Sequence, residues 1–262
     1  MDLIKVLKSI VGINLLNELQ YKGDFFIQFI SVLLDFVLAI LTVDIMFSQI
    51  SALNQWNKVD ILVLVGMYRI FVGIINVFTI PSLSALPGSV ISGDFDYVLL
   101  TPVDSQFFTS MKEVRAWKLS DVILGLIFII YIYATNELSF SLSNLIGALL
   151  MLICGGIIVA CFYSIIASLS FWFNDVSNLL IIIPQCFEWA GKWPVTIFPG
   201  FLRILFTFLI PVGVAITLPT QALLNSINSS DVALTVGFCL LLILLSRIIW
   251  KMGVKRYSGA SS

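Results

Sequence analysis

Long apolar runs separated by short polar segments follow one another along the whole chain. A helix that crosses a membrane needs about 20 predominantly apolar residues. Six stretches are candidates, although the third and fifth are short: Phe25–Ile50, Val59–Ile80, Leu119–Ala134, Leu145–Phe171, Asn178–Trp189 and Val232–Trp250. The pattern predicts an all-α, polytopic membrane protein whose six transmembrane helices form a bundle over residues 25–250.

A further apolar stretch, Phe201–Leu218, is interrupted by Pro211 and closed by Pro219. Proline removes a backbone hydrogen bond, and unpaired backbone groups are tolerated at membrane depth only beside protein or water. We therefore expect short re-entrant helices on the extracellular side before the last span. The alternative is an ordinary span with a kink.

The basic residues predict the orientation, because cytoplasmic loops are enriched in lysine and arginine. With six spans and a cytoplasmic N-terminus, ten of the 14 basic residues fall inside. Lys58, Lys192 and Arg203 fall outside, and Arg69 falls within the second span. Both termini are then cytoplasmic, and residues 251–262 form a cytoplasmic tail. A seventh span would place this basic tail outside.

The first 22 residues do not form a span. Asp2, Lys5 and Ser9 alternate with apolar positions at helical spacing. This pattern is typical of an amphipathic helix that lies in the membrane interface. Such a helix at residues 1–22 would serve either as a simple membrane anchor or as a docking element.

The composition supports one membrane-embedded domain over residues 1–262. Of the 262 residues, 60% are hydrophobic and 11% charged, whereas soluble domains carry about 25% charged residues. The chain has no histidine and a net charge of −1, which excludes histidine-dependent catalysis and an HExxH zinc site and gives no nucleic-acid footprint. We expect no enzyme activity and no catalytic, cofactor-binding or metal-binding residues.

Two ionisable residues lie inside predicted spans, where charges are costly and commonly functional. Asp35 is near the centre of the first span and Arg69 is within the second. If the two helices are neighbours, these side chains can meet. They would then form either a polar point on a translocation path or gate, or a buried pair that sets the register of the helices.

The longest predicted cytoplasmic connection, Pro81–Phe108, is rich in apolar residues around a turn at Gly93, Asp94, Phe95 and Asp96. An exposed segment with so much apolar surface usually docks onto another surface. The candidates are the protein's own helices, the membrane and a partner protein.

No phosphate-binding GxxxxGK[ST] or GxGxxG motif is present, so the chain shows no nucleotide site of its own. The energy for any transport must then come from an ion gradient or from another chain.

Five segments together resemble the membrane subunit of an ABC-2 type transporter, and in order they cover essentially the whole chain. They are NELQYKGDFF, ISGDFDYVLLTPVDSQF, ASLSFWFNDVSNLL, KWPVTIFPGFLRILFTFLIPVGVAITLPTQALL and KRYSGASS.

The resemblance implies a six-helix permease in the plasma membrane of a bacterial cell. It would export substrates as a dimer, either of two identical copies or of two related chains. Two separate cytoplasmic ATPase subunits would bind ATP and magnesium. The resemblance also implies that Met1–Tyr21 is the family's amphipathic helix, that Gly93–Asp96 is its coupling loop, and that Ile197–Leu224 forms its re-entrant helices.

The competing hypothesis is a gradient-driven carrier or channel, in which Asp35 and Asp44 would carry protons or cations. A membrane-embedded enzyme or a scaffold is a third hypothesis. The sequence does not identify the substrate.

Overall fold

The computed structural model describes residues 12, 14, 22–173 and 176–257, and every named element in this part of the chain is helical. The predicted all-α fold class is therefore confirmed. The interfacial helix predicted for residues 1–22 lies almost entirely outside the described residues, as do the last five residues of the predicted tail.

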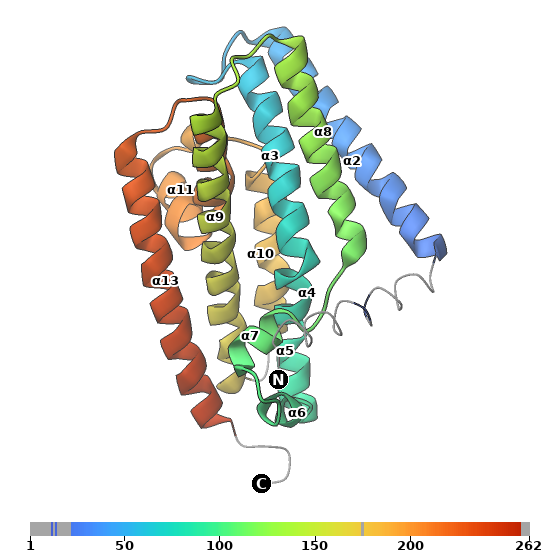
Figure 1. The fold of residues 1–262 in the computed structure, drawn as a ribbon, viewed down its shortest axis with the longest axis vertical. Coiled ribbons are helices and arrows are strands. Elements are labelled where there is room, and N and C mark those ends of the chain that lie inside the picture. The colour runs from blue at the N-terminus through green and yellow to red at the C-terminus, as the bar shows by residue number, and fades with distance from the viewer. Residues whose placement is uncertain (1–11, 13, 15–21, 174–175, 258–262) are drawn as a thin grey trace.

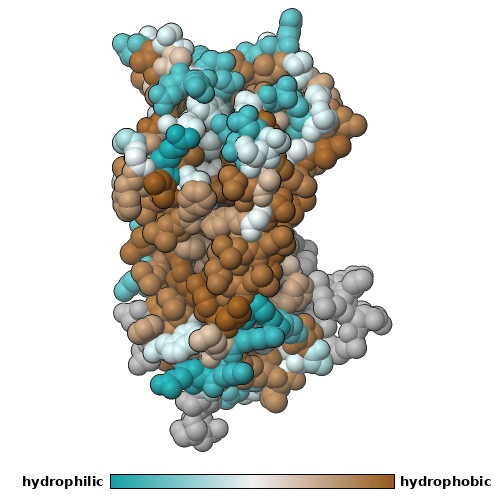
Figure 2. All heavy atoms as spheres, turned by 90° about the vertical axis from the view of Figure 1, so that its left-hand side faces the viewer, coloured by the Kyte–Doolittle hydropathy of each residue, from teal (hydrophilic) through white to brown (hydrophobic). Residues whose placement is uncertain are grey.

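Five helices in the described part of the chain are long and apolar enough to cross a membrane. They run roughly along the long axis of the molecule (Figure 1) and match the first four and the last of the predicted spans. Their bounds are α2 Lys22–Gln49, α3 Lys58–Val77, α8 Leu119–Thr135, α9 Leu142–Ser168 and α13 Ser229–Arg256. Figure 2 shows apolar side chains over the middle of the face where α13 lies, with hydrophilic residues gathered towards both ends.

The fifth predicted span is α10, Ser177–Ala190, which has only 14 residues. Its length of about 21 Å is shorter than the roughly 30 Å hydrocarbon core of a bilayer. Gly191 ends the helix in a crowded place, because a Cβ atom there would lie 2.4 Å from the Phe187 carbonyl oxygen and 2.9 Å from the Tyr68 ring. On its own, α10 therefore reaches only part of the way across.

The apolar stretch that contains Pro211 forms two short arms that meet at 74°. The first arm is α11, Gly200–Ile204, followed by the π-helical η4, Leu205–Leu209. The second is the π-helical η5, Gly213–Thr217, followed by α12, Leu218–Leu223. The predicted break at the proline is confirmed, and the stretch is not a straight span.

Helix α3 lies at the centre of the bundle and is buried along most of its length, including Ile61, Leu64 and Phe71. It packs closely against α8 where Gly66 and Gly125 face each other. A Cβ atom on Gly125 would lie 2.7 Å from the Gly66 carbonyl oxygen. The absence of side chains at this point lets the two backbones approach, as small residues do between membrane helices.

Replacing Gly125 with alanine is expected to destabilise the protein by about 1–3 kcal/mol, because the new methyl group meets backbone that cannot move aside. Unfolding of the purified protein in detergent would measure the loss. Gly156→Ala on α9 is the matched control, since nothing lies within 4 Å of a Cβ atom there. Equal stability of the two variants would contradict the close contact between α3 and α8.

Four short helices follow α3 and pack at one end of the bundle (Figure 1). They are α4 Thr79–Ser84, α5 Leu86–Ser92, α6 Phe95–Leu99 and α7 Ser105–Ser110. The predicted apolar connection is thus a helical unit and not an extended loop. We call this end of the bundle the α6 end. The opposite end carries the α2–α3, α8–α9 and α12–α13 connections.

Candidate functional site

A cluster of charged side chains links four elements inside the bundle. The structure brings the predicted Asp35 and Arg69 together, with Arg69 Nη2 2.5 Å from Asp35 Oδ2. The other guanidinium nitrogen, Arg69 Nη1, lies 3.1 Å from Asp121 Oδ1 on α8. One arginine on α3 therefore joins carboxylates on both neighbouring helices.

Two lysines complete this charge cluster. Lys118, in the short helix η1 (Ala116–Lys118), places Nζ 3.3 Å from Asp121 Oδ2. Lys192, just after α10, places Nζ 3.3 Å from Asp35 Oδ1. The sequence prediction put Lys192 in an outer loop. In the structure Lys192 lies beside the middle of α2, two residues after the end of α10.

The cluster is buried on one side and open on the other. The side chains of Arg69 and Asp121 are 5% and 1% exposed, whereas that of Asp35 is 49% exposed. The guanidinium carbon of Arg69 also lies 5.5 Å from the Phe36 ring centre, within range of a cation–π interaction. The Arg69–Asp121 pair is thus an interior contact. Asp35 is the half-exposed member of the cluster and lies on the outer surface of α2.

Sequence reasoning missed Asp121 and the two lysines as members of the cluster. Asp121 is only the third residue of α8, so it looks like an ordinary polar residue at the end of a span. The one available signal was its spacing of three residues from Lys118, which places the two on the same side of a helix.

The predicted coupling turn has a well-defined geometry at the α6 end. Gly93 ends α5 with φ of 84°, a left-handed conformation that favours glycine. Asp94 accepts a hydrogen bond from Ser92 Oγ at 2.8 Å, and its side chain does not cap α6. Asp96 lies in the first turn of α6 and is partly exposed.

Phe95 points into the protein and is fully buried. Its ring centre lies 5.1 Å from that of Phe171, 5.2 Å from that of Tyr257 and 6.1 Å from that of Trp250. These edge-on contacts hold α6 against the segment just after α9 and against the C-terminal end of α13, and aromatic pairs of this kind add stability beyond area burial. Of the four predicted coupling residues, Phe95 is therefore the one whose side chain is buried.

The exposed face of the short helices at the α6 end is apolar. We call this surface the α6 patch; its members have side chains between 42% and 80% exposed and are Ile91, Tyr97, Leu99 and Leu100. The sequence predicted an apolar connection but not which of its side chains face outward.

Helix α7 is tied to the long helices by polar contacts. Asp104 accepts a hydrogen bond from Phe107 N at the start of α7 and also pairs with Arg247 of α13. Gln106 Nε2 donates to Ser164 Oγ on α9 at 3.0 Å and to Ser246 Oγ on α13 at 2.7 Å. A displacement of α7 would therefore be transmitted to both α9 and α13.

The Asp104–Arg247 pair is expected to make stability depend on pH. Hydrogen bonds from Arg247 hold the pKa of the Asp104 carboxyl below its ordinary value of 3.8. A group whose pKa is lower in the folded state stabilises the protein above its unfolded pKa, and the effect is lost as the pH falls through the folded pKa. Both side chains are about 40% exposed, so the effect should stay below about 1 kcal/mol.

Unfolding of the wild type and of Asp104→Asn across a pH series would measure this effect. The stability difference should be constant above about pH 5 and should shrink below about pH 4. A difference that grows at low pH would contradict the expected sign.

Five long apolar helices, a proline-broken pair and ion pairs between helices define an α-helical integral membrane protein. Residues 33–261 match the family model described as "ABC-2 family transporter protein", and the chain belongs to this family. The match confirms the resemblance seen in the sequence. Comparison with curated proteins and with solved structures gives no match.

Membership makes the chain a permease component of an ABC transporter. Permeases of this family are generally non-catalytic membrane subunits, and membership implies association with ABC ATPases and with a lipid bilayer.

Proposed function

We propose that this chain forms, as a dimer, the translocation path of an ATP-driven exporter. ATP and magnesium would bind to separate cytoplasmic ATPase subunits. The observation that carries the proposal is the structure of the α6 end. There the exposed α6 patch lies on short helices that are held against α9 and α13 by side-chain contacts. An ATPase subunit bound to this patch could therefore transmit its own movement to the long helices.

The contacts at the α6 end provide a route for the movement. When ATP closes the ATPase dimer, force on the α6 patch would pass through Phe95 to α13 and through Gln106 to α9 and α13. Rigid-body shifts of packed helices are a common form of such transitions. The exposed Asp94 and the partly exposed Asp96 would supply polar contacts to the ATPase.

The distribution of basic residues supports a cytoplasmic α6 end. Lys112, Arg115 and Lys118 lie in the connection from α7 to α8, and Lys255 and Arg256 lie in the last turn of α13. Because cytoplasmic segments are enriched in lysine and arginine, both chain ends are proposed to be cytoplasmic, in the plasma membrane of a bacterial cell.

The charge cluster is the proposed gate of the path. Asp35 is half exposed on α2, a helix that also exposes Leu34, Val37 and Leu38 in the single chain. A second permease copy, identical or related, would cover this helix, so that Asp35 and Arg69 border the space between the two copies. Rearrangement of the ion pairs would then accompany opening.

The gradient-driven alternative has less support. Asp35 lies between Arg69 and Lys192, and Asp44 lies 3.0 Å from Lys58 Nζ. Each carboxylate already has a positively charged partner, so neither is placed to take up a transported cation.

The test is co-expression with candidate ABC ATPases from the same organism, followed by purification in mild detergent and measurement of ATP hydrolysis. A Tyr97→Ala/Leu100→Ser variant should lose most of the co-purified ATPase. Phe140→Ala/Leu142→Ser is the matched control, because these two side chains are similarly exposed at the opposite end. Failure of the wild-type chain to associate with the ATPase would refute the proposal.

A separate variant tests the two acidic residues of the turn. Asp94→Ala/Asp96→Ala is expected to weaken the coupling of ATP hydrolysis to transport. Unchanged coupling would remove both residues from this role while leaving the proposed ATPase contact in place.

A further inference from the structure

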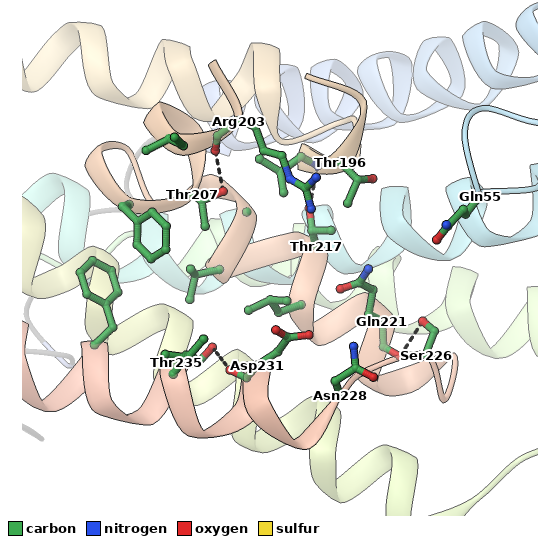
Figure 3. Close-up of a pocket in the computed structure, with 18 residues that line it drawn as sticks. Gln55, Thr196, Arg203, Thr207, Thr217, Gln221, Ser226, Asn228, Asp231 and Thr235 are labelled. Carbon is green, nitrogen blue, oxygen red and sulfur yellow. Dashed lines mark hydrogen bonds between the residues drawn. The ribbon is translucent and has the colours of Figure 1, made fainter. Parts of the chain in front are cut away.

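A cavity of about 470 Å³ lies towards the opposite end of the molecule (Figure 3). The proline-broken pair forms one wall and the first turns of α13 form another, while Gln55 from the α2–α3 connection adds to the lining. The volume is in the range of small-molecule binding sites. Neither the charge cluster nor the α6 patch contributes to it.

One positive and one negative side chain line this cavity. Arg203 comes from α11 and Asp231 from the first turn of α13. In Figure 3 both are directed into the space between the two walls. Within the described part of the chain the guanidinium and the carboxylate form no ion pair with each other or with any other residue.

Three amide side chains that line the same space form no side-chain hydrogen bond with any other described residue: Gln55, Gln221 and Asn228. Asn228 precedes α13 at the N-cap position, where asparagine usually accepts a backbone hydrogen bond, yet its side chain makes no such bond. The hydroxyl groups of Thr207 and Thr235, in contrast, are occupied by backbone carbonyls of their own helices. The charged and amide groups are therefore available to a ligand.

The cavity is polar at one end and apolar at the other. On α11 and η4, Arg203 is followed five residues later by Phe208; on α13, Asp231 is followed seven residues later by Phe238. The two phenyl rings meet edge to face, with their centres 5.7 Å apart. Both walls thus run in parallel from a charged residue to an aromatic ring.

We propose that this cavity binds an amphiphile whose head group carries a phosphate and a primary ammonium group. Arg203 would hold the phosphate with its planar set of donors. Asp231 would accept hydrogen bonds from the ammonium group, with the oxygens of Gln221 and Asn228 beside it, and the apolar part would lie along Phe208 and Phe238. A quaternary ammonium group has no N–H to donate, so it fits this set of acceptors less well.

The proposal concerns binding by this chain alone and does not depend on an ATPase partner. The experiment is native mass spectrometry of the full chain, purified in a nonionic detergent and titrated with lipids that share the same acyl chains. The three probes are phosphatidylethanolamine, phosphatidylcholine and phosphatidylglycerol. We expect phosphatidylethanolamine to bind about tenfold more tightly than the other two, which is the difference that one charge-assisted contact makes.

Two variants separate the roles of the charges. Asp231→Asn should abolish the preference over phosphatidylcholine without weakening phosphatidylglycerol binding, whereas Arg203→Gln should weaken all three lipids about tenfold. Glu137→Gln and Lys58→Gln are matched controls, because they neutralise charges near the same end but outside the cavity. Both control variants should bind the three lipids with the affinities of the wild type.

Equal binding of the three lipids by the wild type would overturn the proposal. So would an unchanged phosphatidylethanolamine affinity in both Arg203→Gln and Asp231→Asn. Asp231→Glu keeps the charge and should keep the preference for phosphatidylethanolamine; loss of the preference in this variant as well would count against the assigned role of the carboxylate.

Discussion

Replacing Arg69 with methionine is expected to destabilise the protein by about 3–5 kcal/mol, the usual cost of removing one partner from a buried ion pair. The substitution leaves the side chain of Asp121, which is 1% exposed, with Lys118 as its remaining partner. It also releases the contact between α2 and α3 through Asp35. Unfolding of the purified protein in mixed detergent micelles would measure the loss.

Two further variants show whether the loss comes from the unpaired carboxylate. Arg69→Met/Asp121→Leu removes the buried charge together with its partner and should recover a large part of the lost stability. Lys58→Met breaks the half-exposed pair with Asp44 and should cost less than about 1 kcal/mol. If Arg69→Met costs no more than Lys58→Met, the charge cluster does not hold the helices together.

Replacing Phe95 with alanine is expected to detach α5 and α6 from the bundle. The side chain is fully buried among three aromatic rings, and truncation of a buried phenylalanine costs about 3–5 kcal/mol. Because the contact lies at the α6 end, the loss should appear as local opening. Amide hydrogen exchange in α5 and α6 should rise strongly while that of α3 stays low.

Tyr97→Ala is the matched control for this substitution. Tyr97 lies in the same short helix, but its side chain is 72% exposed, so its removal should leave hydrogen exchange unchanged. If both variants leave exchange unchanged, the aromatic contacts do not hold α6 in place. If Phe95→Ala also raises amide hydrogen exchange in α3, then α5 and α6 unfold only together with the bundle.

The hydropathy pattern was sufficient to predict the long helices and the break at Pro211, because both depend on local composition. It also identified Asp35 and Arg69, since a charge within an apolar run stands out. The pattern could not show that Arg69 also reaches Asp121, because this contact depends on how α3 and α8 are positioned by Gly66 and Gly125. Close approach of two backbones leaves no periodic signal in the sequence.

The contact between Lys192 and Asp35 could not be predicted, for a related reason. Hydropathy shows at which residue an apolar segment ends, but it does not show where that residue lies relative to the neighbouring helices. Helix α10 ends at Ala190 after 14 residues, and Lys192, two residues further on, meets Asp35. The cavity lined by Arg203 and Asp231 escaped prediction because its walls come from segments that are distant from Gln55 in the sequence.

The short length of α10 brings a charged residue that follows it next to the middle of a long apolar helix. The free energy needed to move a charged or hydrogen-bonding group through a bilayer is concentrated in the hydrocarbon region. A helix of 14 residues covers about 21 Å of that region, which is about 30 Å thick. Lys192 follows this helix and meets Asp35 beside the middle of α2, so the ion pair lowers the free-energy cost of placing these two charged side chains beside a candidate span.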